Sequence, residues 1–263
     1  MVITASVDVN VQGSVAHVTL NQPSKRNAMR LSMWEGLRDG MTSLAANDDV
    51  RIVVVSGAGD RAFCAGADIS EFDDWRGDPE KAAHYDAITR DACNALEHFP
   101  KPTIGRIMGS CIGGGFELAL LCDIRISARS ARFAVTPAKL GLGYNMHDTQ
   151  LLVDRIGAPA TREILFTGRM FTADDALRLG IVNRVVDEAE LDSVIEGYVN
   201  EIATNAPITV QASKAIIAEA VKTPADQNAA LCQSWVDRCY ASADFIEGRR
   251  AFGEKRKPQF TGQ

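Results

Sequence analysis

Hydrophobic and polar positions divide the chain into a mixed first part and a helical second part. In the first part, short segments alternate between apolar and polar residues or run apolar without a break, which is typical of strands. The strongest predicted strands lie at 7–11, 15–20, 52–55 and 104–108. From residue 187 onward only helical spacing remains, with apolar residues three and four positions apart. We therefore predict two domains, an α/β domain over 1–190 and a C-terminal helical domain over 191–263.

Two helix starts in the first part carry capping residues. Ser32, followed by Glu35, has the spacing of a capping box, so a helix is predicted to begin there. Asp78 stands before Pro79, and an acidic cap followed by proline predicts the start of a long second helix. A stretch at 136–147 that contains several glycines and a proline is predicted to be a loop.

The stretch from Lys101 to Ser127 joins a predicted strand to a glycine run and an apolar helix. Three glycines at 113–115 precede 116–121, which is apolar nearly all round and is therefore predicted to be a buried helix. Free backbone N–H groups at its start can hold an anion. Glu117 shares the face of those glycines, and a carboxylate placed there suits acid–base chemistry on a carbonyl compound. A structural role, in which Glu117 complements the helix macrodipole, stays open.

Composition narrows the class of protein. The chain has 263 residues, 46% of them hydrophobic and 24% charged, which is ordinary for a globular protein. Its net charge of −6 argues against binding nucleic acid, and no apolar run approaches the length of a membrane span. The first residues do not resemble a signal peptide, the six cysteines form no CxxC pair, and the four histidines show no metal-ligand spacing. We expect a cytoplasmic protein with reduced thiols and no metal, nucleic-acid or membrane partner.

Three motifs, occurring in a fixed order, carry a family resemblance. They are NQPSKRNAM at 21–29, RAFCAGADI at 61–69 and GGGFELALLCD at 113–123. With these motifs the chain resembles the crotonase superfamily, also called the enoyl-CoA hydratase/isomerase family. The resemblance implies an α/β fold in which ββα units stack as a spiral, with C-terminal helices that mediate a homotrimer or a dimer of trimers. It also implies an acyl-CoA thioester substrate and no separate cofactor, because coenzyme A enters as part of the substrate.

The resemblance also implies particular binding residues. Two backbone N–H groups, those of Ala65 and Gly114, would form an oxyanion hole that holds the thioester oxygen while an enolate develops. The full set implied to contact the substrate is Lys25, Arg26, Ala65, Gly66, Ala67, Asp68, Ile69, Gly113, Gly114 and Lys255. Simpler interpretations stay open for the charged members: a helix cap for Asp68, a solvated surface for the two loop cations, and a cationic helix end for the C-terminal lysine.

Glu117 matches the first catalytic glutamate of the hydratases, which helps to activate the water that adds to the enoyl double bond. Pro137 stands at the position of their second glutamate and cannot transfer a proton. The pattern TPAKLGLGYN at 136–145 resembles methylmalonyl-CoA decarboxylase-like members, which would place Tyr144 near the reacting carbon. Local packing of Tyr144 is an equal alternative. His147 and Asp148 are weaker candidates, because a lone histidine in a loop is usually only exposed.

The resemblance therefore predicts an enoyl-CoA hydratase/isomerase-like enzyme of fatty acid metabolism that works through a stabilised enolate. Decarboxylation of a 2-carboxyacyl-CoA is the second interpretation, because loss of carbon dioxide produces the same enolate. A non-catalytic scaffold that binds acyl-CoA is a third. Glu117 argues against the scaffold, because burying an unpaired carboxylate costs free energy without helping a protein that only binds.

Overall fold

The computed structural model describes residues 5–75 and 77–263. Its strands are β1 (Ser6–Gln12), β2 (Val15–Asn21), β3 (Ile52–Gly57), β4 (Ala62–Cys64), β5 (Thr103–Ile107), β6 (Ser110–Ile112), β7 (Ile124–Ala128), β8 (Arg132–Ala134), β9 (Phe171–Thr172) and β10 (Arg184–Val186). Its α-helices are α1 (Leu31–Ala45), α2 (Phe72–Trp75), α3 (Pro79–Glu97), α4 (Gly114–Leu121), α5 (Pro137–Leu140), α6 (Met146–Thr167), α7 (Ala173–Arg178), α8 (Leu191–Ala203), α9 (Pro207–Ala220), α10 (Ala229–Ala241) and α11 (Ala243–Glu254). Short 3-10 helices lie in the connections: η1 (Pro23–Lys25), η2 (Ile69–Glu71) and η3 (Glu188–Glu190).

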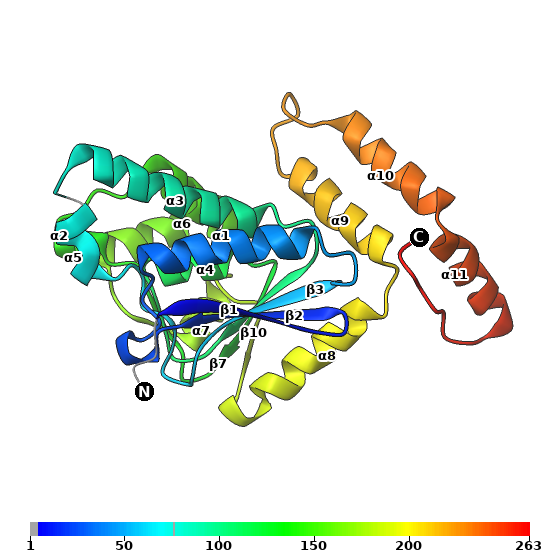
Figure 1. Ribbon diagram of the computed structural model, residues 1–263, viewed down its shortest axis with the longest axis horizontal. Coiled ribbons are helices and arrows are strands. Elements are labelled where there is room, and N and C mark those ends of the chain that lie inside the picture. The colour runs from blue at the N-terminus through cyan, green and yellow to red at the C-terminus, as the bar shows by residue number, and fades with distance from the viewer. Residues whose placement is uncertain (1–4, 76) are drawn as a thin grey trace.

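Pairs of strands followed by a helix repeat along the first part of the chain. One sheet has the order β1-β2-β3-β5-β7-β10, and the other has the order β4-β6-β8-β9. The pairs β2–β3, β3–β5 and β5–β7 are parallel, as are β4–β6 and β6–β8. From β3 onward each unit adds one strand to each sheet, so the chain winds as a spiral (Figure 1). The predicted α/β fold of stacked ββα units is confirmed.

The larger sheet is covered by apolar residues on both faces. Val53 and Val55 of β3 belong to the main core, which also contains the buried faces of α1, α3 and α4. Ile52 and Val54, which alternate with them, belong to a second cluster with α8. Figure 1 shows α1 and α3 on one side of this sheet and α8 on the other. The unbroken apolar run of β3 is the pattern expected for a strand that is buried on both faces.

The last three helices, α9, α10 and α11, stand apart from the two sheets (Figure 1). α9 and α10 pack against each other, and the C-terminal tail returns to α11, where Asp244 accepts hydrogen bonds from the backbone N–H groups of Thr261 and Gly262. Large apolar side chains remain exposed on these helices: Ile217, Val221, Tyr240, Ile246 and Phe252. In the predicted trimer, other copies of the chain would cover these side chains. The trimer stays a prediction.

One predicted helix cap is wrong. α1 begins at Leu31, so Ser32 already lies inside its first turn and forms no capping box. The cap comes from a distant segment instead: Glu71 accepts a hydrogen bond from the backbone N–H of Leu31 at 2.9 Å and one from Arg30 Nε at 2.8 Å. A carboxylate at the helix start satisfies a free N–H group and complements the macrodipole. The other predicted cap, Asp78 at the start of α3, is confirmed.

The stretch at 136–147 is only partly the predicted loop. Pro137 begins the short helix α5, which Gly141 ends in a left-handed conformation. Asn145 then caps α6, accepting a hydrogen bond from the backbone N–H of Asp148. Helix α6 brings its first turn toward α4, which positions the site described below. Within the described residues, no helix is both long and apolar enough to cross a membrane.

Candidate active site

A cavity of about 460 Å³ lies where α1, α3, α4 and the start of α6 meet. Its lining residues are Trp34, Ala67, Tyr85, Asp86, Thr89, Arg90, Cys93, Gly114, Glu117, Asn145, Met146, His147 and Asp148. Of the predicted site residues, Ala67, Gly114 and Glu117 line this cavity, and Tyr144 reaches it by a hydrogen bond to Glu117. The fold therefore brings the second motif, the third motif and the loop after β8 together around one space.

Glu117 is held in the first part of α4, a helix whose other side chains are apolar and mostly buried. The pKa of the Glu117 carboxyl is raised to about 7, mainly by burial and also by the negative charge of Asp148. The hydrogen bond from Tyr144 and the proximity of His147 act in the opposite direction. At neutral pH both the ionised and the protonated forms are therefore populated. A group in that state can accept a proton and also donate one.

Tyr144 donates its hydroxyl hydrogen bond to Glu117 Oε1. Its ring is partly buried against the main core, so it both packs locally and contacts the carboxylate. Burial and the adjacent negative charge of Glu117 raise the pKa of the Tyr144 phenol. The phenol therefore remains protonated and serves as a fixed hydrogen-bond donor to Glu117.

The backbone geometry changes one predicted oxyanion donor. The N–H group of Ala65 donates to the carbonyl oxygen of Arg26 at 3.0 Å, so it is not free to bind a ligand, and the prediction for Ala65 is wrong. Among the described residues, the N–H groups of Ala67 and Gly114 have no acceptor. A Cβ atom built on Gly114 would lie 3.9 Å from the Ala67 nitrogen, so these two groups are close neighbours. Both residues line the cavity.

The misassignment has a clear origin. The motif CAGAD offers two alanines on either side of Gly66, and the sequence contains no local signal that separates them. The loop at 22–28 distinguishes them. Its Arg26 carbonyl oxygen accepts a hydrogen bond from the N–H group of Ala65, whereas Met29 forms a parallel bridge with Ala67. Gly66 has a φ of +96°, a conformation that glycine adopts readily and that turns the chain between the two alanines.

Close packing explains the third glycine of the run. A Cβ atom on Gly115 would lie 2.2 Å from the carbonyl oxygen of Cys64, so only glycine allows α4 to sit this close to β4. Gly114, in contrast, has room: the nearest atoms to an added Cβ are ring carbons of Trp34 at 3.7 Å. Gly113 has a φ of +54° and turns the chain from β6 into α4. The glycine run therefore serves packing at one position and leaves open space at another.

Lys25 and Asp68 form an ion pair beside the cavity. Asp68 is only 4% exposed, and Lys25 Nζ lies 2.8 Å from its Oδ2. Asp68 also accepts a hydrogen bond from the backbone N–H of Ser70, so its predicted role as a helix cap is confirmed for η2. The Lys25 side chain and these hydrogen bonds hold the pKa of Asp68 below its usual value, against the effect of burial. Neither residue is among those that line the cavity.

The remaining predicted binding residues lie around or away from this site. Arg26, at a φ of +54°, ends η1 at the edge of the same loop, and Ile69 is 72% exposed next to Asp68. Lys255 follows the end of α11. Figure 1 shows α11 well apart from α4, so within one chain Lys255 is not brought to Glu117.

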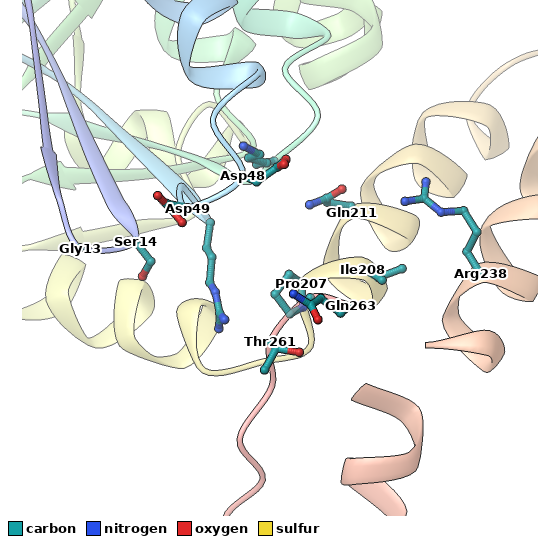
Figure 2. Close-up of a pocket in the computed structure, with 13 residues that line it drawn as sticks. Gly13, Ser14, Asp48, Asp49, Pro207, Ile208, Gln211, Arg238, Thr261 and Gln263 are labelled. Atoms are coloured by element: carbon teal, nitrogen blue, oxygen red, sulfur yellow. The ribbon is translucent and has the colours of Figure 1, made fainter. Parts of the chain in front are cut away.

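A second, larger hollow of about 840 Å³ lies between the sheet region and the C-terminal helices. Figure 2 shows Asp48 and Asp49 on one side of it, with Gln211 and Arg238 on the helices opposite. Arg51 spans this junction, donating to the carbonyl oxygens of Ala203 and Phe260. The hollow contains none of the predicted site residues, and its Arg51 cation is already bound to backbone oxygens. We therefore place the active site in the smaller cavity.

Several cavity residues were not singled out by any sequence motif. Trp34 comes from the buried face of α1, and Arg90 and Cys93 come from α3. Their helical spacing predicts only which face of a helix packs inward. The spiral brings these two helices together over α4. No local signal in the sequence could therefore have identified these residues.

Known proteins are similar to this chain over nearly its whole length. The family described as enoyl-CoA hydratase/isomerase matches residues 10–263. The short-chain-enoyl-CoA hydratase of Clostridium acetobutylicum is 32% identical over 252 residues, which is 96% of both chains. The methylmalonyl-CoA decarboxylase of Escherichia coli is 32% identical over 259 residues, covering 97% of this chain and 98% of the relative.

A solved structure is also closely similar. It is the crystal structure of an enoyl-CoA hydratase/carnithine racemase from Magnetospirillum magneticum, with a TM-score of 0.91 and 37% identity. The match covers 98% of this chain and 96% of that chain. Together with the ββα spiral and the cavity around Glu117, these similarities show that the chain belongs to the enoyl-CoA hydratase/isomerase family.

Proposed function

We propose that this enzyme hydrates a 2-enoyl-CoA thioester in the cavity around Glu117. The observation that carries the proposal is the Glu117 carboxyl itself, which lines the cavity, is hydrogen-bonded by Tyr144 and has a pKa raised to about 7. A carboxyl group with a pKa near the working pH is suited to proton transfer. A scaffold that only bound acyl-CoA would gain nothing from it.

The Ala67 and Gly114 N–H groups would hold the thioester carbonyl oxygen. Both line the cavity, and neither donates to another described residue. As water adds to C3 of the enoyl group, negative charge moves onto the thioester oxygen and an enolate forms. Two fixed donors at that oxygen stabilise the charge in the transition state more than in the substrate, which is the condition for catalysis.

Ionised Glu117 would accept the proton of the attacking water. The pair with Tyr144 fixes the carboxylate in one orientation, so that its second oxygen can face the water. Since the phenol stays protonated, Tyr144 acts as a donor to Glu117 throughout. The water oxygen then bonds to C3, and C2 of the enolate must receive a proton to complete the addition.

Coenzyme A would extend from the thioester toward the loop at 22–28. Lys25 and Arg26 place positive charge there, opposite the phosphates of the substrate, although Lys25 also binds Asp68. A Cβ atom on Gly66 would lie 3.1 Å from the carbonyl oxygen of Ile112 and 3.4 Å from the Gly114 nitrogen, so glycine at this position lets the two segments of the site pack closely. Lys255 could add to this region from a neighbouring copy in the predicted trimer, because α11 projects away from its own chain.

A decarboxylase is the second candidate. Pro137, at the start of α5, occupies the position where the family's second glutamate is expected, and decarboxylation needs no such group. The 32% identity to the Escherichia coli methylmalonyl-CoA decarboxylase supports the same candidate. Loss of carbon dioxide leaves an enolate that the Ala67 and Gly114 N–H groups could hold.

Incubation with crotonyl-CoA and, separately, with methylmalonyl-CoA tests the proposal, with products followed by mass spectrometry. We expect the first substrate to gain the mass of one water. Release of carbon dioxide from the second substrate without hydration of the first would assign the decarboxylase instead. Binding of both esters without turnover of either would contradict both enzymatic assignments.

A further inference from the structure

Addition of water across a double bond needs a second proton-transfer group, and the expected position is proline. Pro137 has no proton to give. Tyr144 is not a substitute, because its hydroxyl hydrogen is already donated to Glu117. The group that delivers a proton to C2 must therefore come from elsewhere in the cavity wall.

The start of α6 places an imidazole and a carboxylate together in that wall. His147 Nδ1 lies 3.3 Å from Asp148 Oδ1, and both residues line the cavity with Glu117. Asp148 is fixed in turn by Asn145, whose Nδ2 donates to Asp148 Oδ2 at 2.6 Å. The His147 side chain is 49% exposed, so it can reach a ligand and exchange protons with water.

The other titratable groups of the wall are less suited to this task. Burial raises the pKa of the Cys93 thiol, which therefore stays protonated and donates weakly. Arg90 does not release a proton at any ordinary pH. Both carboxylate oxygens of Asp148 are already engaged, one by Asn145 and one by His147. Asp86 also lines the cavity, and it lies on α3, the helix that carries Arg90.

We propose that His147 is the catalytic residue that transfers the proton at C2, with Asp148 as its positioning residue. With Asp148 at Nδ1, the other ring nitrogen, Nε2, is left for the substrate. This inference rests on the proposed hydratase function and extends it by assigning the missing second group.

The proposed step balances in atoms and charge. The C2=C3 π bond breaks, the water oxygen bonds to C3, and one water proton passes to Glu117. The enolate then takes a proton from Nε2 of the imidazolium, forming the C2–H bond and leaving neutral His147. Exchange with solvent at the open face of the cavity returns a proton to His147 and removes one from Glu117. In the reverse direction His147 removes the C2 proton and Glu117 protonates the departing hydroxyl.

A purely structural role for this pair makes a different prediction. Asp148 belongs to the N-terminal cap of α6, where it bonds with Asn145, and that function does not require His147. Replacing His147 should therefore leave the fold unchanged under either interpretation. Only the catalytic interpretation predicts that proton transfer at C2 depends on it.

Deuterium exchange separates the two proton transfers. 3-Hydroxybutyryl-CoA is incubated in D2O with each variant, and mass spectrometry follows both deuterium at C2 and formation of crotonyl-CoA. We expect His147→Gln to lose C2 exchange and dehydration together, by about 100-fold or more. Glu117→Gln should retain C2 exchange while losing dehydration, because it lacks only the group that acts at C3. Asp148→Asn should lower C2 exchange by about 10-fold and shift its pH profile.

Two variants serve as controls. His98→Gln removes an exposed histidine at the end of α3, and Asp91→Asn removes an exposed charge from the same helix, away from the cavity lining. Both should exchange at close to the wild-type rate. C2 exchange at the wild-type rate in His147→Gln would overturn the proposal, as would its loss in Glu117→Gln to the same extent. A wild-type enzyme that neither exchanges nor dehydrates this ester would instead contradict the proposed hydratase function.

Discussion

At the scale of single residues, Glu117 combines a functional advantage with a cost in stability. Most of its neighbours along α4 are buried apolar side chains, and burial is the main reason that its pKa is raised from 4.5 to about 7. A carboxyl group whose pKa is higher in the folded state than in the unfolded state favours folding only while it is protonated. That contribution is fully present below about pH 4.5 and is lost as the pH rises through 7.

We therefore predict that Glu117→Gln increases the free energy of unfolding relative to wild type at pH 8, by about 2–3 kcal/mol. Glutamine cannot ionise, so the gain should fall toward zero at pH 4.5. Chemical denaturation of both proteins at pH 8 and at pH 4.5 measures this gain in the free energy of unfolding. Glu201→Gln, on the exposed face of α8, should show no such pH dependence. Equal effects at both pH values would contradict a raised pKa for Glu117.

Tyr144→Phe tests the hydrogen bond to this carboxyl group. The hydroxyl lowers the pKa of Glu117, so its removal should move the rising limb of kcat/KM for hydration to higher pH. Loss of the fixed orientation should also lower kcat by about 10-fold or more, with little change in affinity for the CoA ester. Tyr198→Phe, on α8, is the matched control. An unchanged pH profile and rate would leave Tyr144 with a packing role only.

At the scale of elements, the approach of α4 to β4 sets the geometry of the proposed oxyanion site. A methyl group at position 115 would meet the carbonyl oxygen of Cys64 at 2.2 Å, whereas one at position 114 would meet only ordinary contacts. We predict that Gly115→Ala lowers the free energy of unfolding by about 3 kcal/mol.

Gly114→Ala should change stability by less than about 1 kcal/mol. It should nevertheless reduce turnover strongly, because its methyl group narrows the space beside the Ala67 N–H group. Thermal denaturation and hydration kinetics of the two variants distinguish a glycine needed for packing from one needed for access. Full activity in Gly114→Ala would contradict the proposed position of the thioester oxygen.

Elements were predictable where the deciding interactions are local. Asp78, for example, caps α3 from the position directly before the helix. The cap of α1 could not be predicted, because Glu71 reaches Leu31 from forty residues further along the chain. The sequence also could not show that the Ala65 N–H group is occupied, because its acceptor, the Arg26 carbonyl oxygen, lies in a distant loop.

The site was predictable to the extent that motifs carry it. Glu117, Gly114 and Tyr144 follow from the family pattern, and the structure gathers them at one cavity. His147 pairs with Asp148, the next residue in the sequence, but the position of the pair beside Glu117 depends on how α6 approaches α4, which no local pattern records. A histidine that looked isolated in the sequence therefore lies in a cavity wall in the fold.

At the scale of the whole molecule, large apolar side chains remain exposed on the C-terminal helices as well as on the spiral. Phe166 on the spiral is 77% exposed, Phe252 on α11 is 88% exposed, and Val221, directly after α9, is 77% exposed. Exposed apolar surface of this kind is usually covered by a partner. The predicted trimer would cover it with other copies of the chain.

We predict that sedimentation analysis will show a species three or six times the 28.4 kDa chain mass. Phe252→Ser should shift the distribution toward smaller species, because it removes an apolar contact from the covered surface. Val9→Ser, on the outer strand β1, should leave the distribution unchanged. A wild-type protein that remains a single chain at high concentration would contradict the predicted assembly.

The central claim, proton transfer by Glu117 on an acyl-CoA thioester, is tested most directly by the kinetics of Glu117→Gln with crotonyl-CoA. Binding of the ester is measured in parallel by calorimetry. We expect kcat to fall by about 100-fold or more while affinity for the ester changes little, because glutamine keeps the shape of the side chain but cannot take a proton. Hydration at the wild-type rate by Glu117→Gln would contradict it.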